Sequence, residues 1–117
     1  MHEQSIALSL VDVVTQHLIE AGGDRVRAVV VEVGPLSGVV PAALRSAFRA
    51  AADAEPALRG ATLELRETPV TLYCDACGGE RPAEGANALR CSACGTPSAR
   101  VIRGRELDVV AIELANA

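Results

Sequence analysis

The four cysteines of the chain form two Cys-x-x-C pairs, and they are Cys74, Cys77, Cys91 and Cys94. This spacing is typical of a tetrahedral zinc site in which each pair supplies two thiolates and the segment between the pairs folds back on itself. Gly78 and Gly95 directly follow the two pairs, where the chain must turn tightly and glycine does so with little strain. The sequence therefore predicts a structural zinc ion held by these four cysteines.

Other uses of four cysteines remain open. Two disulfides would require an oxidising compartment, and the amino terminus has no basic segment followed by an apolar run that would indicate secretion. We therefore expect a reducing, cytoplasmic location. A dithiol redox protein could use one of the two pairs, and a zinc-ribbon scaffold or nucleic-acid module could use the zinc alone. Metal analysis would distinguish these alternatives from a protein that carries a second metal.

Composition limits the rest of the fold. The 117 residues suffice for one small domain that carries a zinc module. With one Phe, one Tyr and no Trp, the core must consist of aliphatic side chains. The formal charge of -4 argues against a general affinity for nucleic acid. No apolar run approaches the roughly 20 residues of a membrane span, so none is expected.

Two helices are predicted from apolar periodicity. The first covers residues 4–21 and carries an apolar stripe formed by Ile6, Ala7, Leu10, Val11, Val13, Val14 and Leu18. His17 lies in this helix, and we interpret it as a boundary residue rather than a ligand. The second helix begins at Pro41 and stops at Glu55-Pro56, with its buried face formed by Leu44, Ala47, Phe48 and Ala51.

Strands are predicted at 25–33, 61–67 and 106–114, and residues 70–73 lead into the first cysteine pair as a ribbon strand. A lone strand at 106–114 would leave its backbone unpaired, so we place it beside the other two. The predicted fold class is α+β: a small three-stranded sheet with two helices and an inserted four-cysteine zinc ribbon. The predicted domains are 1–69 with 101–117, and the zinc-binding ribbon 70–100.

The amino terminus is a candidate for a second metal site. Met1-His2-Glu3 offers an α-amine, backbone amides and an imidazole within three residues. Closely spaced nitrogen ligands suit the tetragonal geometry that Ni(II) or Cu(II) prefers. The alternative is that His2 belongs to an ordinary frayed terminus. Beyond the cysteine pairs, the chain contains no phosphate loop, no Ser/His/Asp arrangement and no H-E-x-x-H motif.

Several separated motifs resemble one known family. They are Met1-His2-Glu3, Ser5-Ile6-Ala7, the stretch from Val33 to Pro41, the paired C-x-x-C motifs and Gly104-Arg105-Glu106-Leu107. In this order they resemble the HypA/HybF family, the nickel-insertion metallochaperones of hydrogenase maturation. The resemblance runs from the first residue to about residue 114.

The resemblance implies a nickel carrier, not an enzyme. By it, the His2 imidazole is the main side-chain ligand of Ni(II), and backbone nitrogens of His2 and Glu3, with the Met1 amine as a further candidate, complete the set. The four zinc cysteines of the family correspond to the four cysteines named above. The implied partners are a GTPase accessory protein and the large subunit of a [NiFe]-hydrogenase, and some relatives also serve urease.

Overall fold

The computed structural model describes residues 3–115 of the chain. Met1 and His2, both predicted nickel ligands, lie outside the described residues. The chain divides into two compact units. The helical unit contains residues up to 31, residues 39–66 and residues from 108 onwards, and the ribbon unit contains residues 32–38 and 67–107.

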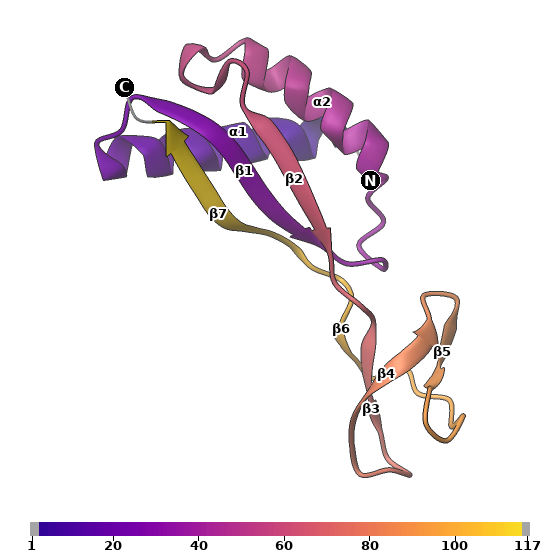
Figure 1. Ribbon diagram of the computed structural model, residues 1–117. Helices are drawn as coiled ribbons and strands as arrows, with labels where there is room; N and C mark the ends of the chain where they lie inside the picture. The colour runs from indigo at the N-terminus through magenta and orange to yellow at the C-terminus, as the bar shows by residue number, and fades with distance from the viewer. Residues whose placement is uncertain (1–2, 116–117) are drawn as a thin grey trace. The chain divides into compact units, whose positions relative to one another are not determined.

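The helical unit is built from two helices and a three-stranded sheet (Figure 1). The elements that contribute to it are α1 (Glu3–Ala21), β1 (Arg25–Val33), α2 (Pro41–Asp53), the 3-10 helix η1 (Pro56–Leu58), β2 (Thr62–Glu67) and β7 (Leu107–Ala115). The strand order is β2-β1-β7, and the arrows of β1 and β2 point the same way, opposite to β7. The predicted α+β class, with the cysteine-containing segment inserted between β2 and β7, is confirmed.

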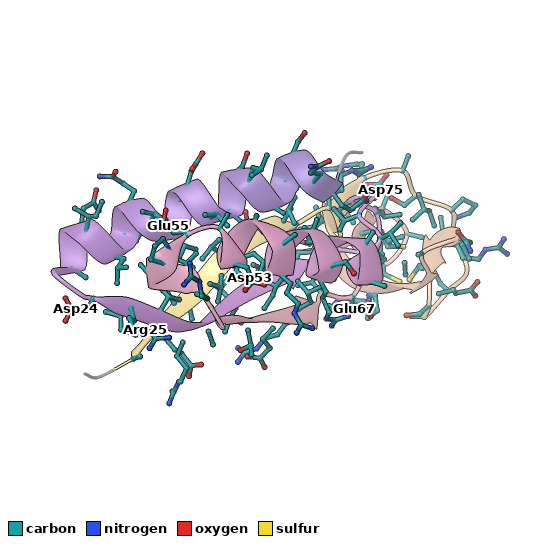
Figure 2. The ribbon with its side chains drawn as sticks, turned by 90° about the horizontal axis from the view of Figure 1, so that it is seen from above. Asp24, Arg25, Asp53, Glu55, Glu67 and Asp75 are labelled. Atoms are coloured by element: carbon teal, nitrogen blue, oxygen red, sulfur yellow. The ribbon has the colours of Figure 1, made fainter. Side chains whose placement is uncertain are left out.

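The helices lie side by side along one face of this sheet, as Figure 2 shows from above. The buried stripe of α1 is formed by Ala7, Leu10, Val11, Val14 and Leu18. Val13 was predicted to belong to it, but its side chain is 43% exposed. It is one residue, about 100° of helix rotation, away from the buried Val14, and this places it at the edge of the packed face. Among the described residues, no helix has the length and apolarity to cross a membrane.

The buried face of α2 is narrower than its sequence indicates. Leu44, Phe48 and Ala52 are buried, each one turn of the helix after the last. Ala47 and Ala51, predicted to be buried, are only half-buried and line a groove between α1 and α2 of about 730 Å³. The helix ends at Asp53, just before the predicted stop, and the chain continues into η1.

The ribbon unit contains a four-stranded antiparallel sheet. Its strands are β3 (Thr71–Cys74), β4 (Gly79–Gly85), β5 (Ala88–Cys91) and β6 (Val101–Arg103), in the order β5-β4-β3-β6. Only the first of these strands was expected from the sequence. Because β6 pairs with β3, this sheet extends to Arg103. The division of the chain into a nickel-binding and a zinc-binding domain remains a prediction.

Three segments of the ribbon unit meet where the chain continues from β1 and β2 and leads into β7. We call residues 33–36, 68 and 104–106 the neck. The Gly34 amide donates to the Glu106 carbonyl at 2.8 Å, and the Leu36 amide donates to the Gly104 carbonyl at 2.7 Å. A Cβ atom on Gly34 would lie 2.1 Å from the backbone of Gly104. Only glycine therefore allows these two segments to come this close.

The Glu106 side chain also ties the neck together. Its Oε1 accepts a hydrogen bond from the Thr68 hydroxyl at 2.7 Å and another from the Gly104 amide at 2.8 Å. These bonds, led by the one from Thr68, hold the pKa of the Glu106 carboxyl below its usual range. The carboxylate is therefore a structural acceptor that joins residues distant in sequence.

Candidate metal centre

The ribbon unit brings the four cysteine sulfurs together. All four lie within 4.8 Å of one another. The Sγ atoms of Cys74 and Cys94 are 3.5 Å apart, and those of Cys77 and Cys91 are 3.8 Å apart. A tetrahedral ion with metal–sulfur bonds of about 2.3 Å requires sulfur–sulfur separations of about 3.8 Å. A disulfide requires about 2.05 Å, and all four cysteines are free thiols. The cluster therefore has the dimensions of a shared metal site.

The two cysteine pairs form equivalent tight turns. The Gly78 amide donates to the Cys74 carbonyl at 2.8 Å, and the Gly95 amide donates to the Cys91 carbonyl at 2.8 Å. Gly78 and Gly95 have φ angles of 74° and 76°, in the left-handed region that glycine adopts without strain. The prediction that these glycines close the turns is confirmed. Each turn directs both of its thiols toward the same point.

The ribbon sheet supplies the rest of the support. Cys74 ends β3 and Cys91 ends β5, and both are buried with Leu72 in the small core of this unit. The Ser92 amide donates to the Pro82 carbonyl at 3.0 Å, which fixes the second turn to β4. Cys94 is exposed, so a bound ion would lie at the edge of the unit rather than deep inside it.

The pKa values of two of the cysteine thiols are shifted in opposite directions. Hydrogen bonding to Cys94, and then to Cys74 and Cys91, raises the pKa of Cys77 to about 12. The Thr96 hydroxyl, 3.2 Å from the Cys94 sulfur, and the Thr96 amide lower the pKa of Cys94 to about 6. A divalent ion would displace the shared protons, because thiolates are the metal-binding form. Thr96 was not identified as part of the site from the sequence.

Of the predicted nickel-binding tripeptide, only Glu3 belongs to the described residues. It begins α1, and its Oε2 accepts a hydrogen bond from the Val40 amide at 3.1 Å. Nothing in the sequence indicated this contact across 37 positions. His17 is exposed, and its Nδ1 lies 3.8 Å from a carboxylate oxygen of Glu20. It is remote in sequence from the cysteine cluster and lies in the other unit.

Comparison with known proteins identifies the family. The model for "Hydrogenase/urease nickel incorporation, metallochaperone, hypA" matches residues 1–114. The chain belongs to the HypA family. Hydrogenase maturation factor HypA from Chloroflexus aggregans is 42% identical over 113 residues, which cover 97% of this chain and 98% of that protein. The corresponding factor from Deinococcus radiodurans is 43% identical over 109 residues, covering 93% of this chain and 89% of that protein.

Solved structures support the fold. The solution structure of the Ni metallochaperone HypA from Helicobacter pylori superposes with a TM-score of 0.72 and covers 97% of each chain at 23% identity. A second HypA solution structure gives a TM-score of 0.74 at 23% identity, over 98% of this chain and 97% of that one. The family model and the relatives of about 42% identity confirm the family resemblance seen in the sequence motifs. The chain belongs to a family of nickel metallochaperones for hydrogenase maturation, and it carries a four-cysteine metal-binding cluster.

Proposed function

We propose that this protein is a cytoplasmic nickel carrier rather than an enzyme. The observation that carries the proposal is the family match from residue 1 to residue 114, which includes Met1-His2-Glu3 at its start. Ni(II) binds to the His2 imidazole and to backbone nitrogens of His2 and Glu3, with the Met1 amine as a further candidate ligand. These are the nitrogen donors that Ni(II) favours in tetragonal geometry.

The second half of the proposal concerns the cysteines. We propose that the four-thiolate cluster holds Zn(II), which keeps the ribbon unit folded. Four thiolates fill the coordination shell of zinc and leave no open position, as is usual in structural sites. The nitrogen site at the terminus, by contrast, suits cargo that must be released. Zinc maintains structure, and nickel is transported.

We propose the delivery partners that the family resemblance implies. The carrier docks with a GTPase of the same pathway and passes nickel to the large subunit of a [NiFe]-hydrogenase. Proteins of urease maturation are additional partners, in keeping with a family description that includes both hydrogenase and urease. Mixing the nickel-loaded chain with purified GTPase and immature large subunit tests this step, with nickel content of the large subunit as the measurement. Equal nickel transfer by free nickel alone would contradict it.

Nickel titration of zinc-loaded protein tests the site itself. We expect about one nickel per chain in addition to zinc, and affinity at least about tenfold weaker after His2→Ala or after a histidine-free extension before Met1. The extension converts the α-amine to an amide and crowds the His2 ligands. The same extension after Ala117 is the matched control and should change nothing. Unaltered affinity in both amino-terminal variants would refute the proposed site.

The titration also distinguishes the alternatives. A zinc-ribbon scaffold would bind zinc alone, and a dithiol redox protein would hold no stable metal. Nickel affinity should fall as the pH drops through about 6.5, the reference pKa of imidazole, because only neutral imidazole coordinates. Nickel binding that is flat across this range would exclude a histidine-based site.

A further inference from the structure

The start of α2 lacks a cap of its own. Its N-cap residue is Val40, whose backbone is extended and whose side chain makes no capping hydrogen bond. Pro41 follows at the first helical position and has no N–H to offer. Ser, Thr, Asp or Asn would ordinarily accept a hydrogen bond at the N-cap and complement the positive end of the helix dipole. The N-cap residue of α2 therefore supplies neither a side-chain acceptor nor a negative charge.

Glu3, from the other helix, accepts a hydrogen bond from the N–H of the N-cap residue itself, the bond that a Glu at the third helical position makes in a capping box. Its Oε2 lies 3.1 Å from the Val40 nitrogen, and the two residues are 37 positions apart. Glu3 is also the acidic residue in the first turn of α1. Its carboxylate is therefore placed at the positive ends of two helices, and both favour a negative charge. The helix dipoles therefore stabilise the Glu3 carboxylate in its position beside the start of α2.

We propose that Glu3 is a positioning residue for nickel: its carboxylate is held at the start of α2 by the bond from Val40 and does not bind the metal. The inference rests on the proposed function. Ligands on consecutive residues bind well when the backbone that carries them is already fixed, because less conformational freedom is lost on binding. The bond from Val40 fixes the chain immediately after the predicted ligand His2.

The anchor can be tested without nickel. Hydrogen exchange at the Val40 amide is measured by NMR in the zinc-loaded full chain, in Glu3→Ala and in Glu3→Gln. We expect Val40 to exchange about tenfold faster in Glu3→Ala, because its acceptor is gone, and at an intermediate rate in Glu3→Gln, which keeps a neutral acceptor. Asp12→Asn removes a charge from the exposed face of the same helix and should leave the rate unchanged. Equal rates in wild type and Glu3→Ala would overturn the proposal.

Nickel binding then distinguishes a positioning role of Glu3 from direct coordination of the metal by its carboxylate. We expect affinity about tenfold weaker in Glu3→Ala and less affected in Glu3→Gln, with the same nickel X-ray absorption spectrum in all three proteins. A spectrum that changes in Glu3→Gln, with loss of an oxygen donor, would show that the carboxylate is a ligand and overturn the proposal. Unchanged affinity in Glu3→Ala would also overturn it.

The measurements distinguish failure of the proposed function from failure of the Glu3 anchor. If the wild-type protein bound no nickel at its terminus, both the carrier assignment and the positioning role of Glu3 would be wrong. The exchange rate of Val40 would still show whether the anchor itself exists. Weaker nickel binding in His2→Ala together with unchanged Val40 exchange in Glu3→Ala would leave the carrier standing and remove the anchor.

Discussion

The two units of this protein differ in the size of their buried cores. The helical unit buries aliphatic side chains from α1, α2 and β1 around Phe48, which is 1% exposed. The buried core of the ribbon unit's cysteine cluster consists of Leu72, Cys74 and Cys91. A cluster this small contributes little hydrophobic free energy compared with the conformational entropy lost on folding. We therefore expect the ribbon unit to depend on a bound metal ion, whereas the helical unit is stabilised by its packed side chains.

Loss of one cysteine ligand should have the largest effect, and it should affect the ribbon unit but not the helical unit. We expect Cys77→Ala or Cys91→Ala to abolish zinc binding and disorder residues 70–100, because zinc binding contributes about 10–16 kcal/mol in small zinc peptides. Amide signals of the helical unit should remain dispersed, since its own core persists. Metal analysis and NMR measure the two effects. Ser92→Ala, between the ligands of the second pair, is the control. Full zinc content in both cysteine variants would contradict the four-thiolate assignment.

The opposite result is expected from a core truncation in the helical unit. Phe48→Ala should lower the free energy of unfolding of that unit by about 3–5 kcal/mol, through lost burial and the cavity left behind. Zinc content should not change. Urea denaturation followed by helix circular dichroism gives the stability, and Arg49→Ala, at the next and exposed position of α2, is the control. Loss of zinc in Phe48→Ala would show that the two units do not fold independently.

The neck allows a sharper test within the ribbon unit. Gly34→Ala would place a methyl group 2.1 Å from the backbone of Gly104, and backbone cannot move aside as a flexible side chain can. We expect a cost of about 2 kcal/mol or more, because one segment must shift. The measurement is the urea midpoint of the ribbon amides in the zinc-loaded protein. Gly85→Ala, with no atom within 4 Å of the added methyl, is the control. Equal midpoints for the two variants would refute the steric account.

The sequence predicted what depends on local pattern. The helix at α1, the strand at β1 and the glycine turns after each cysteine pair follow from periodicity, β-branched content and the need for positive φ. The clustering of the thiols follows from their spacing, because paired Cys-x-x-C turns have few ways to share an ion.

What depends on distant contacts was missed. Val13 fits an apolar stripe equally well in sequence, and only the position of the packed neighbours leaves it exposed. Strands β4 and β5 carry too few large apolar residues to be recognised, since their stability comes from pairing and from the cysteine turns. The bond between Glu3 and Val40 joins two helix starts that no local rule relates.

The smallest effect is expected at Glu106 in the neck, where the stability contributed by hydrogen bonds to the carboxylate depends on pH. Hydrogen bonds, first from the Thr68 hydroxyl, lower the pKa of this carboxyl in the folded protein. Its stabilising contribution is therefore present above the unfolded pKa of about 4.3 and is lost as the pH falls through the lower folded value. Thr68→Val should raise the pKa of Glu106, measured by carbon NMR of the carboxyl, and lower stability near neutral pH by about 1 kcal/mol. Thr62→Val, exposed on β2, is the control. A Glu106 pKa that is the same in Thr68→Val and wild type would show that this hydroxyl does not hold the carboxylate in place.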